Sequence, residues 1–377
     1  MTSEVFITRT AAFLPHDPVS NDEIEEVLGM VGGKPSRARR LILRSNGIQT
    51  RHYALDRTTR VPSMSNAQMT ANAIRALGDI GQVDCLATGT SMPDQLMPNH
   101  AVMVHGELGW PRLEAVALSG ICVSGAAALK HAWLSVRSGD SRRAVASGSE
   151  LCSPVLRGEF FQAENEHQLR ALETAPQIAF EKDFLRWMLS DGAGTALLES
   201  QPRGPLSLRI DWIDLSSAAH QLPACMYLGA EKNTDGSLSG WLNYSPAEWA
   251  EKSVFAVKQD VKLLNEHIVR ATLIEPLSDI MTKRGLRADD IDWFLPHISS
   301  MYFAEPIENA LKKIGLPIPR ERWFSNLTTR GNTGSASPYI MLDELFRSGR
   351  ITRGQKLLMF VPESGRFSSC FIFLQAV

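Results

Sequence analysis

The sequence lacks a long hydrophobic run and lacks a strong charge of either sign. A membrane helix needs about 18 consecutive apolar residues, and no segment approaches that length. The N-terminal segment also lacks the basic start and apolar stretch of a signal peptide. We therefore expect no membrane span and a cytoplasmic location. The formal net charge of −2 argues against a nucleic-acid-binding surface as the main function.

Cysteine is scarce, and its positions are scattered. An odd number of cysteines without CxxC spacing makes a disulfide framework or a zinc site an unfavoured interpretation, so we expect no metal and a reducing compartment. The 377 residues, 44% of them hydrophobic, are enough for a large core and for two domains. The cysteines are Cys85, Cys122, Cys152, Cys225 and Cys370.

Residues 115–136 place one of these cysteines, Cys122, between a short apolar segment and a helix. The apolar run 116–118 is typical of a buried strand, Gly120 interrupts it, and small residues over 124–128 permit a helix. A cysteine at a helix N-terminus meets free N–H groups and the positive end of the helix dipole, which favour the thiolate. Placement alone leaves a nucleophile and a buried, inert cysteine equally open.

Strands and helices alternate along the chain, which predicts an α/β protein with mostly parallel sheets. The pattern partly restarts after residues 202–205, and we expect two similar halves, residues 1–201 and residues 202–377. The polar segment 156–187 is expected to form an insertion or cap. No glycine pattern has the strand-to-helix context of a dinucleotide site.

Two further polar residues lie where predicted strands give way to loops: His297 after the strand 291–295, and Asn332 in the turn 329–334. Sites in parallel α/β proteins gather at such ends. Each residue also has a plain structural explanation, a hydrogen-bonded turn histidine and a left-handed turn asparagine. With Cys122 they suit acyl-thioester chemistry, in which a thiolate attacks a carbonyl while His and Asn N–H groups hold an enolate oxygen. Papain-like proteases share the residue order but differ around the cysteine, so we rank that interpretation lower.

One dense basic run covers residues 32–44 and includes Arg37, Arg39, Arg40 and Arg44. Such runs are usually solvated helix faces. The alternative is a patch that contacts a phosphate-bearing substrate or an acidic carrier protein. The sequence alone favours the solvated face.

The chain resembles the ketoacyl-synthase III branch of the thiolase fold nearly from end to end. Five motifs carry the resemblance, and the three that follow the cysteine motif in the chain are the strongest evidence for it. The motifs are Asn46-Gly47-Ile48 with Arg51-His52, the Cys122 turn, Asp191-Gly192-Ala193-Gly194, Pro296-His297, and Gly331-Asn332-Thr333 with Ser335-Ala336-Ser337.

This resemblance implies a thiolase-like fold of two similar, layered α/β halves and a catalytic triad of Cys122, His297 and Asn332. It implies an oxyanion hole made by the backbone N–H groups of Cys122 and Gly365. It also implies a homodimer in which Met97 lines the acyl tunnel of the partner subunit. The substrates would be thioesters of acyl carrier protein or of coenzyme A, and no bound cofactor is expected.

The sequence departs from the family pattern in four respects and shows a narrower resemblance over one segment. The tryptophan that stacks on the adenine of coenzyme A has no counterpart near Leu41, and the gap between Cys122 and His297 is longer than in fatty-acid starter enzymes. Residues 298–300 after His297 differ from the usual continuation, and the loop 363–367 keeps a single glycine. The segment 33–54 is similar to the ketosynthases of dialkylresorcinol biosynthesis. Those enzymes join a β-ketoacyl thioester to an α,β-unsaturated acyl thioester and close a 1,3-cyclohexanedione ring. Near Met97 there is no glutamate, which argues mildly against the pyrone-forming and head-to-head relatives.

Two other functions remain open at this stage. The first is a starter ketoacyl synthase III that uses malonyl carrier protein for fatty-acid or polyketide synthesis. The second is a non-catalytic, ketosynthase-like partner subunit. The presence of Cys122, His297 and Asn332 together argues against the second, because an inactive partner has no chemical need for all three.

Overall fold

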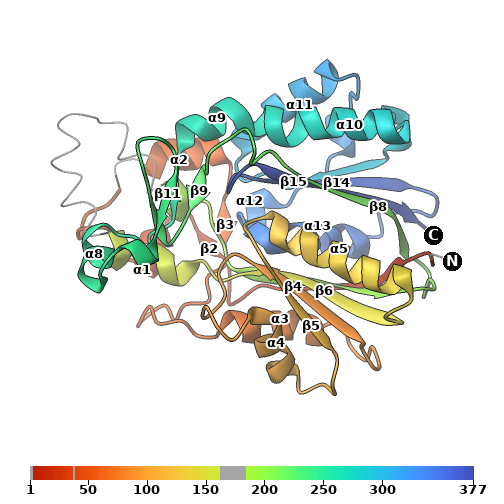
Figure 1. The fold of residues 1–377 in the computed structure, drawn as a ribbon, viewed down its shortest axis with the longest axis horizontal. Helices are drawn as coiled ribbons and strands as arrows, with labels where there is room; N and C mark the ends of the chain where they lie inside the picture. Colours follow the sequence, from red (N-terminus) through yellow and green to blue (C-terminus); the bar gives the residue numbers. More distant parts are fainter. Residues whose placement is uncertain (1–2, 37–38, 162–183) are drawn as a thin grey trace.

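A nine-stranded sheet runs through the computed structural model, which describes residues 3–36, 39–161 and 184–377 (Figure 1). The strand order is β13-β14-β15-β8-β1-β7-β6-β4-β5. Most of the expected insertion over 156–187 lies outside the described residues. The strands of this sheet are β1 (Phe6–Phe13), β4 (Cys85–Thr90), β5 (Glu114–Ser119), β6 (Arg143–Glu150), β7 (Gly192–Glu199), β8 (Leu208–Ser217), β13 (Trp293–Pro296), β14 (Lys356–Glu363) and β15 (Ser368–Ala376).

The sheet consists of two groups of strands that meet at a narrow seam. Strands β1, β4, β5, β6 and β7 are neighbours, and β8, β13, β14 and β15 are neighbours on the other side. The seam is the pairing of β1 with β8 at two positions, Phe6–Arg209 and Ile7–Leu208. The connection from β7 to β8 contains the division that we expect between residues 201 and 202, and that division stays a prediction.

The strand directions are mixed. Pairs β4–β5, β4–β6 and β13–β14 are parallel, as expected for the parts of the sheet that carry the candidate site. The pairs between them, from β14–β15 through to β6–β7, are antiparallel. Between β14 and β15 the reason is local, because residues 364–367 form a connection too short for the crossover that parallel strands require.

Helices form layers around the two groups of strands (Figure 1). Helices α5 and α13 lie in the central layer, where α5 contacts β4 and β6 and also β14 and β15, while α13 packs on β1 and β7. Helices α3 and α4 cover the outer face of the first group, and α9, α10 and α11 cover the second. None of the helices in the described ranges is both long and apolar enough to cross a membrane.

The longer helices are α3 (Asn66–Arg75), α4 (His100–Leu108), α5 (Val123–Ser138), α9 (Val261–Val269), α10 (Glu275–Arg284), α11 (Ala304–Lys313) and α13 (Ser337–Arg347); a π-helical segment (Arg270–Ile274) joins α9 to α10. The shorter helices are α1 (Ile24–Leu28), α2 (Arg39–Asn46), α8 (Pro246–Glu251) and α12 (Leu327–Arg330). The short strands are β2 (Val19–Ser20), β3 (Thr50–Arg51), β9 (Met226–Tyr227), β10 (Ala230–Lys232), β11 (Leu238–Gly240) and β12 (Lys258–Gln259).

Side-chain caps set where several of these helices begin. Ser65 and Gln68 form a capping box at the start of α3, in which each side chain accepts a backbone N–H of the other residue. Asn99 caps α4 and Asp260 caps α9 through their side-chain oxygens. Helix α5 ends at Gly139, whose φ of 84° is the left-handed conformation that glycine adopts without strain.

The loop before α13 brings its backbone into direct contact with the first group of strands and with α5. A Cβ atom at Gly148 would lie 2.1 Å from the carbonyl oxygen of Ser335, and one at Gly125 would lie 2.2 Å from the same oxygen. Glycine at both positions therefore lets the segment that carries Asn332 approach the helix that begins beside Cys122. The contact fixes the distance between the two halves of the candidate site.

We predict that Gly148→Ala destabilises the protein, because the new methyl group meets backbone that cannot rotate away. Overpacking of this kind costs about 1–3 kcal/mol, and we expect the midpoint of urea unfolding to fall accordingly. Gly106→Ala is the matched control, because Gly106 lies inside α4 with nothing within 4 Å of its added Cβ. That change should raise stability by roughly 0.5–1 kcal/mol. Equal midpoints for the two variants would contradict the close contact.

Candidate active site

Cys122 lies where strand β5 ends and helix α5 begins, as the sequence predicts. The turn 120–122 follows β5, and Cys122 is the N-cap residue of α5 with helical backbone angles. It is partly accessible, whereas the other four cysteines are buried. Accessibility is a condition for a reactive thiol, so the structure favours the nucleophile over the inert cysteine.

The resting thiol is held protonated by its surroundings. The Glu363 side chain accepts hydrogen bonds from the backbone N–H groups of Ile121 (2.9 Å) and Val123 (3.0 Å). Burial and the negative charges of Glu363 and Glu150 raise the pKa of the Cys122 thiol well above its usual range. The expectation that the helix N-terminus favours the thiolate is wrong for this state, because a carboxylate already binds the neighbouring N–H groups. Cys122 needs a base to lose its proton.

His297 follows β13 directly, and its ring is uncharged at neutral pH. The backbone N–H of His297 donates to the carbonyl oxygen of Phe360 at 2.7 Å, which continues the β13–β14 ladder by one residue. The side chain is buried, and neither ring nitrogen has a partner among the described residues. Burial lowers the pKa of His297 to about 4. A neutral ring can accept a proton from a thiol or donate its own N–H to an oxygen.

Hydrogen bonds of its backbone N–H, its backbone carbonyl and its side-chain Oδ1 orient Asn332. Its N–H donates to the carbonyl oxygen of Met188 (2.9 Å), and its carbonyl accepts the N–H of Ser190 (2.9 Å). Its Oδ1 accepts the N–H of Gly334 at 3.0 Å, which leaves the Nδ2 hydrogens for a ligand. The residues of this turn with positive φ are Gly331 (70°) and Gly334 (52°), so the alternative role for Asn332 as a left-handed turn residue is wrong.

One cavity is lined by Cys122, His297 and Asn332 together. The rest of its lining is mostly apolar, and no described lining residue is lysine or arginine. The apolar side chains come from elements of both halves. They include Met188, Leu189, Leu264, Ile268, Phe303 and Ile307. The three residues predicted from the sequence therefore share one apolar compartment in which acyl chains can be buried.

A carboxyl group that sequence reasoning missed, Glu150, lines the same cavity. It is the last residue of β6 and is 1% exposed. Ser91 Oγ donates to it at 2.6 Å, and the backbone N–H groups of Ser91 (3.2 Å) and Ser335 (3.1 Å) also donate to it. Burial raises its pKa to about 7. Its position at the end of a strand, as for Cys122 and His297, is the signal in the sequence that could have indicated it.

Gly365 lies against the Cys122 turn, as an oxyanion-hole residue must. A Cβ atom at Gly365 would meet Ile121 Cδ1 at 2.8 Å and Glu363 Oε1 at 3.2 Å. The single glycine of the loop 363–367 is therefore at the position of closest approach. The oxyanion-hole role of the Cys122 and Gly365 N–H groups stays a prediction. Glu363 was visible in the sequence as the residue that replaces a glycine of the family loop.

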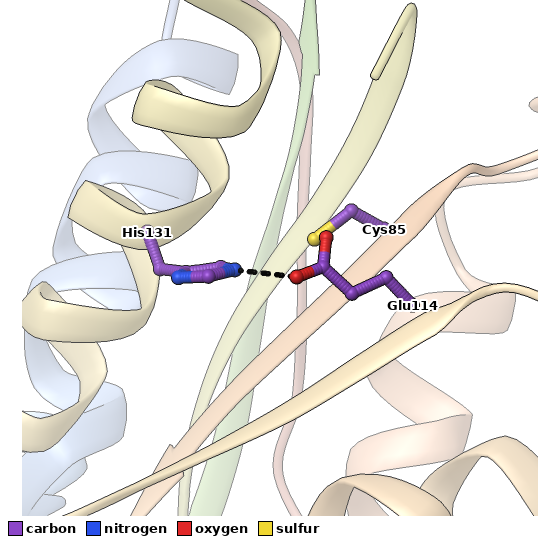
Figure 2. A group of neighbouring side chains, drawn as sticks. All are labelled: Cys85, Glu114 and His131. Atoms are coloured by element: carbon purple, nitrogen blue, oxygen red, sulfur yellow. Dashed lines mark hydrogen bonds and ion pairs between the residues drawn. The ribbon is translucent and has the colours of Figure 1, made fainter. Parts of the chain in front are cut away.

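A group of potential metal ligands lies where β4 and β5 begin, at the ends of these strands away from the Cys122 turn. Figure 2 shows His131 of α5 facing Glu114, with the Cys85 thiol beside them. His131 Nε2 lies 3.3 Å from Glu114 Oε1. A metal would need the Cys85 thiolate, but burial raises the pKa of Cys85 to about 12. We assign no metal to this group, and the expected absence of a metal stays a prediction.

The fold is shared with solved condensing enzymes. The chain matches AbyA1, a tetronic acid condensing enzyme, with a TM-score of 0.73 and 20% identity over 98% of this chain and 99% of that one. It matches Xanthomonas campestris OleA, solved with lauric acid and lauroyl-CoA, with a TM-score of 0.70 and 18% identity over the whole of both chains. The protein therefore has the thiolase-like α/β fold that the sequence predicts.

Sequence comparison adds evidence on the kind of enzyme. The C-terminal model of 3-oxoacyl-[acyl-carrier-protein] synthase III matches residues 281–372, and the N-terminal domain model of beta-ketoacyl synthase matches residues 43–203. A beta-ketoacyl-[acyl-carrier-protein] synthase III of Xanthomonas oryzae pv. oryzae (strain MAFF 311018) is 26% identical over 357 residues, which cover 94% of this chain and 93% of the relative. The protein is an acyltransferase, and both its halves are similar to condensing enzymes of the ketoacyl-synthase III type.

We predict that Asn332→Ala separates acyl loading from condensation. In the predicted division of roles, its Nδ2 donates to the enolate oxygen and takes no part in deprotonating the thiol, so acyl-enzyme should still form. Loss of one such donor typically slows a reaction by on the order of 100- to 1000-fold, and carbon–carbon bond formation should slow by that factor.

Intact-protein mass spectrometry measures the loading, and chromatography of the products measures the condensation. His297→Ala should slow the loading as well, because the high pKa of the Cys122 thiol requires a proton acceptor. Cys122→Ala is the blank for both measurements. An Asn332→Ala protein that could not be acylated would contradict this division of roles.

Proposed function

We propose that the enzyme joins a β-ketoacyl thioester to an α,β-unsaturated acyl thioester and closes a 1,3-cyclohexanedione ring, the precursor of a dialkylresorcinol. The observation that supports this proposal is the apolar, cation-free lining of the cavity shared by Cys122, His297 and Asn332. The sequence resemblance over residues 33–54 supports the same reaction. AbyA1 has the same fold and is named as a tetronic acid condensing enzyme. OleA also has this fold, and its structure was solved with lauric acid and lauroyl-CoA. Neither name states the proposed reaction, so the proposal depends on the cavity.

The lining favours two neutral acyl groups over one acyl group and malonate. A malonyl unit brings a carboxylate, and an unpaired charge moved from water into a protein interior costs several kcal/mol. Here it would find Glu150 in the lining and Glu363 beside Cys122, with no lysine or arginine among the described lining residues. β-Ketoacyl and enoyl groups carry no charge and gain from the burial of their chains.

The three predicted catalytic residues divide the reaction as follows. Cys122 attacks the first thioester, the carrier thiol leaves, and an acyl-enzyme forms. The carbanion of the second thioester attacks the acyl carbon, and its enolate oxygen is held by His297 and Asn332. The bond to Cys122 breaks as the carbon–carbon bond forms, and conjugate addition to the unsaturated acyl unit closes the ring. The ring still carries the second thioester, which water hydrolyses, and the resulting β-keto acid loses carbon dioxide to give the cyclohexanedione.

Two subunits are part of the proposal. Strand β5 is the last strand of the sheet, and its residues are partly or fully exposed. An unpaired edge of this kind is suited to pairing with a second copy. Met97 is 84% exposed and does not line the cavity of its own chain. This placement supports the expectation that Met97 reaches the acyl tunnel of the partner subunit.

The carrier-docking surface is narrower than the basic run suggests. Arg39 pairs with Asp22 at 2.6 Å and with Glu25 at 3.6 Å, so its charge is already compensated. Arg40 and Arg44 are exposed on α2. Arg37 lies outside the described residues. We therefore propose that Arg40 and Arg44 contact an acidic carrier protein or the phosphate of a pantetheine arm.

The name of the Xanthomonas oryzae relative favours a second candidate, a starter enzyme that uses malonyl carrier protein. Product analysis separates the two functions. We predict that the wild-type enzyme, given a β-ketoacyl and an enoyl thioester without malonyl carrier, releases a ring product detectable by mass spectrometry. A requirement for malonyl carrier and release of a linear β-ketoacyl chain would show that the starter function is correct.

We predict that Arg40→Glu and Arg44→Glu each lower kcat/KM for acyl carrier protein by about tenfold at low salt, because steering by exposed charges acts on the association rate. The loss should shrink as salt rises. Arg142→Glu is the matched control, since Arg142 is exposed at the end of β6 opposite Glu150. Unchanged kinetics in the two α2 variants would leave the run a solvated helix face.

A further inference from the structure

The cavity contains one carboxyl group that the triad does not use. Glu150 is the only Asp or Glu among the described lining residues, and it shares the cavity with Cys122, His297 and Asn332. On the basis of the function proposed above, we propose that Glu150 is the base that removes the proton from the carbon nucleophile. It would be a catalytic residue in addition to the three predicted from the sequence.

The proposed condensation requires such a base, whereas a malonyl condensation does not. Malonate loses carbon dioxide and leaves its bonding electron pair on the carbon that attacks. A β-ketoacyl thioester has a C–H bond at the attacking carbon, so a proton must be taken away before an enolate exists. An enzyme that uses two such thioesters therefore needs a proton acceptor at the site, within hydrogen-bond reach of the substrate carbon or one water away.

The other groups at the site are poor candidates for this step. Cys122 is acylated when the second substrate reacts, so its thiolate is absent. His297 donates its ring N–H to the enolate oxygen in the proposed reaction, so it serves as a donor at this step. Asn332 cannot accept a proton at neutral pH. Glu363 does not line the cavity and is bound to the N–H groups on either side of Cys122.

The contacts of Glu150 hold its carboxyl group in place and leave it reactive. Ser91 gives it two hydrogen bonds and Ser335 a third. An ionised carboxyl group has about four acceptor positions, and at the fourth the described residues place only the Cys152 thiol, a weak donor 4.0 Å from Oε2. Gly334 permits the approach, because a Cβ atom there would lie 2.6 Å from Glu150 Cγ. The segment that carries Asn332 thus also fixes Glu150. A group whose pKa is about 7 suits proton transfer near neutral pH.

Protons and electrons balance without a further reactant. The Glu150 carboxylate takes the proton, and the C–H electron pair becomes the enolate, whose oxygen is held by His297 and Asn332. The enolate carbon attacks the acyl carbon on Cys122, the new C–C bond forms, and the C–S bond breaks. The leaving thiolate takes a proton back from Glu150. One thioester has become a ketone, and the carboxylate and the thiol are restored.

The test measures proton removal directly. Wild-type enzyme and Glu150→Gln are incubated in D₂O with a short β-ketoacyl pantetheine thioester, and deuterium uptake at the attacking carbon is followed by NMR above the rate of enzyme-free exchange. The glutamine side chain keeps an oxygen for Ser91 and Ser335 but cannot accept the proton. We expect uptake and condensation to fall by about 100- to 10,000-fold, while acyl loading of Cys122 is kept.

The pH profile supplies a second readout. In the wild-type enzyme the exchange rate should fall as pH drops below about 7, because Glu150 is then protonated. The other titratable groups around it are His297, Cys122 and Cys152, and their pKa values lie well away from 7 in this structure. Asp191 acts on Cys152 and titrates near 6. Glu150→Asp should recover part of the rate and the same direction of pH dependence, and Glu150→Gln should show no such step.

Controls separate the possible failures. Glu199→Gln neutralises another buried glutamate, at the far end of β7, and should keep wild-type exchange. Exchange that persists in Glu150→Gln overturns the inference even if the wild-type enzyme makes the ring product. Loss of acyl loading in Glu150→Gln also overturns it, since Glu150 would then be structural. Failure of the wild-type enzyme to make a ring product overturns the proposed function, and the exchange measurement still decides the role of Glu150.

Discussion

The contact between the Ser335 carbonyl and the two glycines Gly125 and Gly148 is the constraint on which the site depends. Cys122 belongs to one group of strands, and the predicted enolate-binding residues His297 and Asn332 belong to the other. A side chain of any size at either glycine would separate them. Because Ser335 also donates to Glu150, this one segment sets the position of a donor and of a carboxyl group relative to Cys122.

The second constraint is electrostatic. At rest the cavity contains a protonated thiol, a neutral imidazole and a carboxyl group whose pKa lies near neutrality. An apolar compartment tolerates this arrangement because it holds little fixed charge. Charge then appears during the reaction, first as the thiolate and later as the enolate. N–H donors already in place stabilise such charge far better in this environment than in water.

The sequence predicted the parts of the site that depend on local order. Cys122 was recognisable from a strand, a turn and a helix, and His297 and Asn332 from their positions after strands. Glu150 was not, because its role depends on Ser91 and Ser335, which are distant in the chain. The same limit applies to the central antiparallel strands, whose partners are distant in the sequence, such as β1 with β7 and β15 with β8, and to the basic run. There the charge of Arg39 is compensated by acidic side chains that the basic pattern does not reveal.

The seam between β1 and β8 pairs at two positions, Phe6–Arg209 and Ile7–Leu208, while the central helices hold the rest of the two halves together. The first half supplies Cys122 and Glu150, and the second supplies His297 and Asn332. A chain opened between β7 and β8 would therefore yield two fragments, one with the nucleophile and one with the enolate donors. Neither fragment has a complete reaction of its own, so condensation by the mixed fragments would report their reassociation without any added label.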